Sequence, residues 1–171
     1  QHDNGALRGF TCAAEGEVAL EAVSPAWPLH ADSRRDPQTL ALCLDYLARP
    51  HRRPFFLVAD FNNPHDICNW VGAFAGPHED IPPPVPLPEL PANFEIDDLE
   101  TRPRPIQYIC CSHVRLSQAA SWTAANYRHY LAAYYHYVNR LDAMVGRLLA
   151  ALQASDAAAD TLVVLMADHG D

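Results

Sequence analysis

The chain has 171 residues, of which 49% are apolar and 19% charged, and this composition suits one globular domain with a hydrophobic core. Its formal net charge of -9 argues against nucleic acid or an anionic membrane as a partner. All twelve basic residues are Arg, so a mechanism that needs a Lys cannot draw it from this chain.

The two ends of the chain and its cysteines narrow the class further. The start, QHDNGALRGF, has no initiator Met and no basic stretch followed by an apolar one, and no apolar run is long enough to span a bilayer as a helix. The sequence stops directly after ADHGD, and we therefore expect a portion of a longer domain. The five Cys include no Cys-x-x-Cys pair, which argues against a zinc site, and their odd number gives no disulfide framework.

The first predicted element is a helix that ends before Pro50. Residues 1–35 show no sustained period and are expected to form loops with short elements. Asp36 suits a helix cap, and Pro37 suits the first helical position. Four apolar residues then repeat at helical spacing, namely Leu40, Cys43, Leu44 and Leu47.

Two apolar runs have the length and composition of buried strands. FFLVADF follows Pro54 at 55–61, and TLVVLMA occupies 161–167. Neither run alternates apolar with polar residues, which is typical of a strand covered on both faces. Polar residues follow each run directly, at Asn62–Asp66 and at Asp168–Asp171.

A proline-rich stretch and a long helix are predicted between these runs. Six of the eleven residues in Ile81–Pro91 are Pro, which leaves a flexible linker or an extended segment laid over a surface; the apolar residues between the prolines favour the second. Thr123 to about Gln153 is predicted to be one helix, because eight apolar residues recur at steps of four and three. They are Tyr127, Leu131, Tyr134, Val138, Leu141, Val145, Leu148 and Leu152. A coiled coil is the competing interpretation, but the run is short and leads directly into a strand, so we expect the helix to lie against a sheet.

The order of these elements indicates the fold class. The predicted order is a helix, a strand, a long connecting segment, a second helix and a second strand. This order predicts an α/β fold with a mainly parallel sheet flanked by helices. In such sheets ligands gather beyond the carboxyl ends of the strands. The two polar clusters lie at those ends, so we expect them to contribute to one site.

The polar cluster after the second run contains candidate metal ligands. An ionised Asp168 and a neutral His169 suit a divalent cation, and Gly170 allows the backbone to turn close to it. The alternative is that Asp168 caps a following helix and that His169 is an exposed loop residue.

His65 is the candidate catalytic residue of the first cluster. It follows Pro64, which fixes the direction of the loop, and it could contact an anionic oxygen or donate a proton to a leaving group. A solvent-exposed His without a role is the alternative. Asp66 could orient the imidazole or cap the turn into Ile67–Trp70.

Two long stretches resemble blocks of the sulfatase family. RPFFLVADFNNPHDICNW resembles the segment in which a strand of the form PFFL leads into a Pro-His loop. The stretch from Tyr127 to Asp171 is similar to the family's helix with a Leu-Asp…Val-Gly pattern, followed by its strand ending in Asp-His-Gly. LPANFEI is similar to the link between these blocks in some bacterial sulfatases. The resemblance covers Pro54 to Asp171 in the right order and is weak over residues 1–50.

The resemblance implies an alkaline-phosphatase-like fold and hydrolysis of sulfate esters. In this family the nucleophile is a formylglycine made from the first residue of a Cys/Ser-x-Pro-x-Arg motif. A Ca²⁺ ion neutralises the sulfate, held by acidic residues of an early strand and by a later Asp-Asn or Asp-His pair. The resemblance assigns Asp168 and His169 to that later pair, and His65 to the contact with the sulfate or the leaving oxygen. It also matches His2 to the tail of the family's Gly-Lys-x-His motif, as a catalytic histidine, and gives Asp171 no role.

The chain departs from the family at the nucleophile. No Cys/Ser-x-Pro-x-Arg motif occurs, and CSHVR has His113 where the proline belongs and follows the Pro-His loop instead of preceding it. The early acidic ligands are missing as well. We therefore expect residues 1–171 to be the central part of one sulfatase catalytic domain whose nucleophile lies N-terminal to Gln1. We expect the isolated chain to show no sulfatase turnover.

Two alternatives stay open. One is a phosphodiesterase or phosphonate monoester hydrolase of the same superfamily, which the identity of the nucleophile would discriminate. The other is a non-catalytic module that binds sulfated glycans, which loss of the nucleophile motif would favour. The expected partner is a sulfated small molecule or glycan, a periplasmic or secreted location follows from the habit of the family, and the oligomeric state is not predicted.

Overall fold

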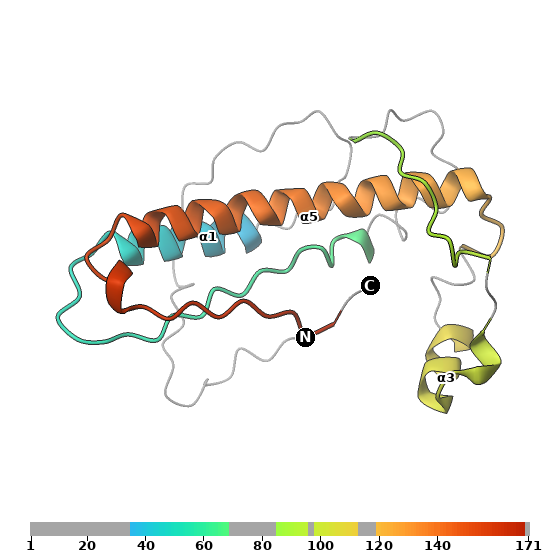
Figure 1. Cartoon of the computed structure of the whole chain (residues 1–171), viewed down its shortest axis with the longest axis horizontal. Helices are drawn as coiled ribbons and strands as arrows, with labels where there is room; N and C mark the ends of the chain where they lie inside the picture. The colour runs from blue at the N-terminus through green and yellow to red at the C-terminus, as the bar shows by residue number, and fades with distance from the viewer. Residues whose placement is uncertain (1–34, 69–84, 96–97, 113–118, 170–171) are drawn as a thin grey trace. The chain divides into compact units, whose positions relative to one another are not determined.

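The structure, a computed structural model, describes residues 35–68, 85–95, 98–112 and 119–169. Its helices are α1 (Arg35–Leu47), α3 (Arg104–Ser112) and α5 (Ala124–Gln153), with 3-10 turns η1 (Leu99–Thr101) and η2 (Ala158–Asp160) (Figure 1). These residues divide into two compact units. The first unit holds 35–62 and 141–169, and the second unit holds 63–68, 85–95, 98–112 and 119–140. The expectations for residues 1–34 concern a part of the chain outside the described ranges.

Helix α1 confirms the helix predicted before Pro50. It begins at Arg35, one residue before the expected cap, and its first turn contains Asp36 and Pro37. The predicted apolar stripe faces inward: Leu40, Cys43 and Leu47 are buried and Leu44 is half-buried. The stripe therefore forms the core of the first unit around α1.

The two apolar runs are extended, but no residue of the described ranges is assigned to a strand. In 55–61 the side chains alternate, since Phe56 is 77% exposed and Val58 60%, while Phe55 and Leu57 are half-buried. The predicted burial on both faces is therefore not met in the described part of the chain. A strand buries both faces only when neighbouring strands flank it and other layers cover it.

The second run, 161–167, is exposed along almost its whole length. Leu162, Leu165 and Met166 are each more than 80% exposed, and only Thr161 is half-buried. Such a continuous apolar run in water is costly, at about 25 cal/mol for each Å² of apolar surface. The composition of the run thus fits a buried position better than the exposed one observed here.

Helix α5 confirms the long helix predicted from Thr123 to about Gln153. Thr123 and Asn126 form a reciprocal cap. The Asn126 N–H donates to Thr123 Oγ1 over 3.3 Å, and the Thr123 N–H donates to Asn126 Oδ1 over 2.8 Å. Two backbone N–H groups near the helix start are satisfied in this way, as in a capping box.

The most buried face of α5 lies one residue before the predicted stripe. The buried residues of α5 are Asn126, Ala132, Ala133, Tyr137 and Met144, and four of these five directly precede a stripe residue. Val138 of the predicted stripe is 37% exposed, and the other stripe residues are half-buried. In the second unit, Ile67 packs against Ala133 and Tyr137, and all three are fully buried. The partner of α5 there is the turn that carries His65, and this contact sets which face is deepest.

The described part of the proline-rich stretch lies against α5 through one arginine. Arg128 Nε donates to the carbonyl of Pro88 over 2.7 Å, and its Nη2 lies 3.2 Å from both the Leu87 carbonyl and Glu89 Oε1. A further contact comes from Phe94, whose ring meets Tyr127 edge-on at 5.0 Å. The extended stretch is thus fixed by main-chain hydrogen bonds that a Pro-rich segment, which has few N–H donors, can still accept.

Across the ranges that the structure describes, none of the helices has the length and apolar character that crossing a membrane requires.

Candidate active site

A buried carboxylate in α1 fixes the end of the first extended run. Asp36 is fully buried, and its Oδ1 accepts a hydrogen bond from the backbone N–H of Asn62 over 2.6 Å. Beside it, Thr39 Oγ1 donates to the carbonyl of Asp60 over 3.2 Å. The first turns of α1 therefore hold the point at which the run ends and the Pro-His loop begins.

Asp36 is predicted from the sequence only as a helix cap, and its contact with Asn62 is not predicted. A signal for it was present, because Asp36 stands in register with Leu40, Cys43 and Leu47 on the apolar face of α1. A carboxylate in that position has to be paired or hydrogen-bonded, since burying an unpaired charge is expensive.

The Pro-His loop is a tight turn anchored by its buried side chains. The Asn63-Pro64 peptide bond is cis, and the Ile67 N–H donates to the carbonyl of Pro64 over 3.0 Å. Asn63, Asp66 and Ile67 are all buried, at 5%, 1% and 0% exposed. These buried side chains hold the loop in a defined shape, and the loop exposes the side chain of residue 65 to solvent.

His65 is that exposed side chain, and its imidazole meets a thiol. The distance between His65 Nδ1 and Cys68 Sγ is 3.8 Å. If the thiol donates to Nδ1, the ring proton of the neutral imidazole is at Nε2; if Nδ1–H donates to sulfur, Nε2 carries a lone pair. The tautomer of His65 therefore decides whether the Cys68 thiol donates to Nδ1 or accepts from it, and the contact between these two side chains was not predicted from the sequence.

Asp168 and His169 follow the second extended run and are both exposed. The side chain of Asp168 is 89% exposed and that of His169 72%. Asp168 Oδ1 accepts a hydrogen bond from the backbone N–H of His169 over 2.9 Å, and Oδ2 lies 3.6 Å from His169 Nε2. The local contact holds the carboxylate and the imidazole on the same side of the backbone.

The geometry of this donor pair fits a shared divalent cation. Two ligands about 2.3–2.6 Å from one Ca²⁺ ion lie roughly 3.3–3.7 Å apart when they meet at a right angle. The 3.6 Å between Asp168 Oδ2 and His169 Nε2 falls within that range. Among the described residues, no group of three or more His, Cys, Asp or Glu comes together at metal-binding distance.

The predicted site residues fall in different parts of the structure. His65 belongs to the second unit, and Asp168 and His169 belong to the first. Their convergence on one site therefore stays a prediction. His2 and Asp171 lie outside the described residues.

Comparisons with known proteins give the family. A family model described as Sulfatase matches residues 9–171. The chain is 47% identical over 170 residues to a Delta 4,5-hexuronate-2-O-sulfatase of Bacteroides thetaiotaomicron, a match that covers 99% of this chain and 35% of that protein.

Two solved structures are similar as well. One is a candidate sulfatase from Bacteroides thetaiotaomicron, with a TM-score of 0.71 and 43% identity over 91% of this chain and 33% of that one. The other, a 2-O GAG sulfatase, gives a TM-score of 0.65 at 43% identity over 82% of this chain and 30% of that one. The chain spans only about a third of the length of the relatives that it matches. The Pro-His loop, the Asp-His pair and the family model together show that this chain belongs to the sulfatase family.

Proposed function

We propose that this chain is the central part of a sulfatase catalytic domain, and that the whole protein hydrolyses a sulfate ester on an acidic saccharide. The family match over residues 9–171 supports the reaction class. The relatives described as a Delta 4,5-hexuronate-2-O-sulfatase and a 2-O GAG sulfatase support a 2-O-sulfated uronic acid as the substrate. The structural observation that carries the proposal is the exposed pair of donors, Asp168 and His169, at the end of an apolar run. An extracytoplasmic location is part of the proposal, because members of the family are usually periplasmic or secreted.

The proposed fold is alkaline-phosphatase-like, with 55–61 and 161–167 as two strands of a mainly parallel sheet. Similarity to solved sulfatases at TM-scores of 0.71 and 0.65 supports it. The exposed apolar side chains of both runs support it too, since neighbouring strands and helices would remove them from water. In that arrangement the Pro-His loop and the Asp-His pair both follow carboxyl ends of strands, where α/β sheets bind ligands.

Asp168 and His169 would hold the Ca²⁺ ion of the site. When bound, such an ion supplies positive charge to the oxygens of the sulfate. The carboxylate is a ligand that Ca²⁺ prefers, whereas an imidazole is more typical of Zn²⁺ or Fe²⁺ sites. The backbone hydrogen bond to Asp168 Oδ1 leaves Oδ2 as the oxygen that faces the imidazole and a shared cation.

His65 would act on the sulfate or on the oxygen that leaves. Its exposed ring sits on a turn whose neighbours, Asp66 and Ile67, are buried, so it can reach a ligand without moving the backbone. With the Cys68 thiol donating to Nδ1, Nε2–H can donate to a sulfate oxygen or protonate the leaving alkoxide. The formylglycine that the resemblance implies would supply the nucleophile from outside residues 1–171.

The test uses the protein made from the complete gene, with and without single substitutions. Sulfate release is measured from an unsaturated 2-O-sulfated disaccharide, and bound metal is measured by elemental analysis. We expect Asp168→Ala to lower kcat/KM by at least about 100-fold and to lose the metal. We expect His65→Ala to lower kcat by about 10²–10⁴-fold with the metal retained.

Three comparisons make the result specific. Asp142→Ala removes an exposed carboxylate of α5 and should leave turnover and metal content unchanged. His169→Asn, which replaces the imidazole with an oxygen donor, should keep Ca²⁺ bound. Faster turnover of the matched phosphate ester would identify a phosphodiesterase instead. Full activity and full metal content in Asp168→Ala would refute the metal assignment.

A further inference from the structure

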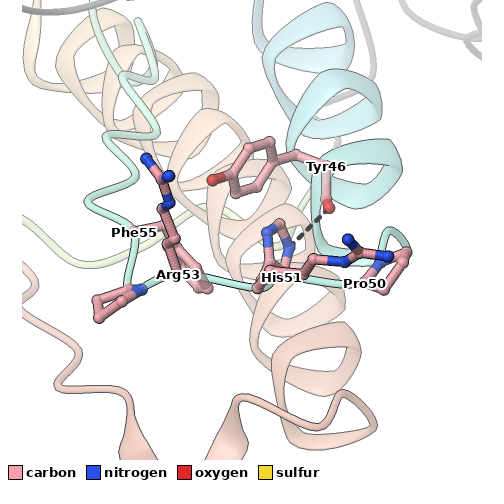
Figure 2. Close-up of a pocket in the computed structure, with 7 residues that line it drawn as sticks. Tyr46, Pro50, His51, Arg53 and Phe55 are labelled. Atoms are coloured by element: carbon pink, nitrogen blue, oxygen red, sulfur yellow. Dashed lines mark hydrogen bonds between the residues drawn. The ribbon is translucent and has the colours of Figure 1, made fainter.

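A second polar feature of the first unit lies beside the end of α1. Tyr46 and residues 50–55 line an open hollow of about 380 Å³ (Figure 2). None of the candidate active-site residues lines it. The hollow stands at the amino end of the extended run 55–61, whereas Asn62 and the Pro-His loop follow its carboxyl end. The run 55–61 has seven extended residues, which corresponds to a length of roughly 20 Å.

Three of the residues that line the hollow carry rings that pack against one another, tilted or edge-on. The His51 ring lies 4.5 Å from Tyr46 and 4.8 Å from Phe55, and Tyr46 meets Phe55 edge-on at 5.5 Å. The Nε2–H of His51 donates to the backbone carbonyl of Tyr46 over 3.0 Å, as the dashed line in Figure 2 shows. The same carbonyl, in the last turn of α1, also accepts a hydrogen bond from the Arg49 N–H over 3.1 Å, and the bond to His51 holds the imidazole in place. The rings thus form a fixed platform instead of a set of independent side chains.

The rim of the hollow is cationic although the whole chain is acidic. Arg52 and Arg53 are exposed, and within the described residues no carboxylate forms an ion pair with either. The nearby Arg49 differs, because it pairs with Asp45. Residues 46–59 contain three of the twelve arginines of the chain and no Asp or Glu.

The arrangement of the arginines favours a bound anion. Figure 2 shows the Arg53 side chain extended on the side of the Tyr46 hydroxyl. A guanidinium group offers a planar fork of N–H donors that matches a carboxylate or sulfate group. Two such forks beside an apolar ring platform provide a contact for charge and a contact for the body of a ring-shaped ligand.

We propose that this hollow is a second glycan-binding site, in which Arg52 and Arg53 bind sulfate or carboxylate groups of an acidic saccharide and the ring platform contacts a sugar ring. The choice of a saccharide rests on the proposed function, and the anion preference rests on the hollow itself. The hollow binds one part of a long glycan, while the sulfate that is hydrolysed lies on another part of the same glycan. It should therefore affect long glycans and leave a disaccharide unaffected.

The test compares two double variants of the full-length protein in the Asp168→Ala background. R52Q/R53Q removes both charges of the hollow and keeps polar side chains of similar size. R35Q/R104Q removes two charges from exposed positions in α1 and α3 and serves as the matched control. Binding is measured by calorimetry with a 2-O-sulfated heparin dodecasaccharide and with its desulfated, N-acetylated, carboxyl-reduced counterpart. Thermal melts show that each variant is folded.

We expect R52Q/R53Q to weaken binding of the sulfated dodecasaccharide by at least tenfold and R35Q/R104Q to change it by less than twofold. The uncharged counterpart should bind at least tenfold more weakly than the sulfated probe to the parent protein. With Asp168 intact, R52Q/R53Q should raise KM for the dodecasaccharide at unchanged kcat and leave disaccharide turnover unchanged.

Equal binding of the sulfated probe by R52Q/R53Q and its parent would overturn the proposal, as would equal binding of the charged and uncharged probes. If R52Q/R53Q is unfolded, the single variants R52Q and R53Q replace it, with the same criterion of weaker binding. The calorimetric comparison does not need turnover. A protein that binds through the hollow but releases no sulfate would refute the proposed function and leave the glycan site standing.

Discussion

At the scale of single residues, the described structure assigns its clearest positioning role to Asp36. The sequence predicted the helix that contains this residue but not its partner, because Asn62 lies 26 positions away and no local pattern connects the two. His65, Asp168 and His169 could be named from short motifs and from the family resemblance. The thiol beside His65 could not, because Cys68 comes close only when the loop turns back on itself.

Replacing Asp36 should loosen the start of the Pro-His loop. We expect Asp36→Ala to lower the free energy of unfolding by about 1–3 kcal/mol, because the Asn62 N–H loses its acceptor in a partly buried place. Chemical denaturation measures the loss, and hydrogen exchange should show faster exchange at the Asn62 amide. Asp45→Ala, which removes an exposed carboxylate paired with Arg49, should cost less than about 1 kcal/mol. Unchanged exchange at Asn62 would contradict the assigned role.

The Cys43 thiol should make stability depend on alkaline pH. Burial raises the pKa of Cys43 above its ordinary value of 9.0. Above pH 9.0 the unfolded chain loses this proton while the folded chain keeps it, so the free energy of unfolding falls as pH rises, until the folded thiol also ionises. The contribution of the buried neutral thiol to the free energy of unfolding is therefore complete below pH 9.0 and is lost progressively above it.

A pH series of denaturation curves for the wild type and Cys43→Ala isolates this effect. The stability difference between the two proteins should be constant from about pH 7 to 9 and should then shrink by up to about 1.4 kcal/mol per pH unit. A stability difference that stays constant up to about pH 10.5 would show that Cys43 titrates normally in the folded chain. This pH is roughly one unit or more above the ordinary thiol pKa.

At the scale of elements, α1 and α5 were predicted from the sequence, α3 (Arg104–Ser112) was not, and no strand pairing is observed among the described residues. α1 and α5 start within one residue of the expected positions, because caps and apolar periodicity are local properties of the sequence. The deepest face of α5 was misplaced by one residue, since it depends on Ile67, a contact from a distant segment. The extended runs were predicted as strands, yet burial on both faces needs neighbours that the described residues do not provide.

Gly146 offers a test of the exposed face of α5. It lies within the helix, is exposed, and an added Cβ would meet no described atom within 4 Å. Gly146→Ala should therefore raise the free energy of unfolding by about 0.5–1 kcal/mol, because alanine loses less backbone entropy in a helix. The reverse change nearby, Ala150→Gly, should lower it by a similar amount. A loss of stability in Gly146→Ala would show that another segment packs closely against this face.

At the scale of the whole molecule, the sequence predicted the family, and the structure describes the local geometry of the two segments that carry the predicted site residues. Two ordered blocks of sequence carried the family resemblance, and the match over residues 9–171 confirms it. The α/β sheet could be proposed from the order of elements, but its hydrogen bonds join segments far apart in the chain and no local pattern contains them. The cationic hollow was missed for a related reason. The residues HRRP at 51–54 match no known sequence motif. They line a hollow only because Tyr46, from the preceding helix, packs against His51 and Phe55.

The exposed apolar run at 161–167 is a possible site of aggregation before the protein has folded completely. Seven residues without Pro or charge, rich in β-branched and aliphatic side chains and open to solvent, resemble the segments that seed intermolecular β-aggregates. Acidic residues border it on both sides, at Asp160 and Asp168. Like charges at the borders repel a second copy of the same segment, as gatekeeper residues do. By this argument, we expect the carboxylate proposed as a metal ligand also to oppose self-association of the newly made chain while this run is exposed.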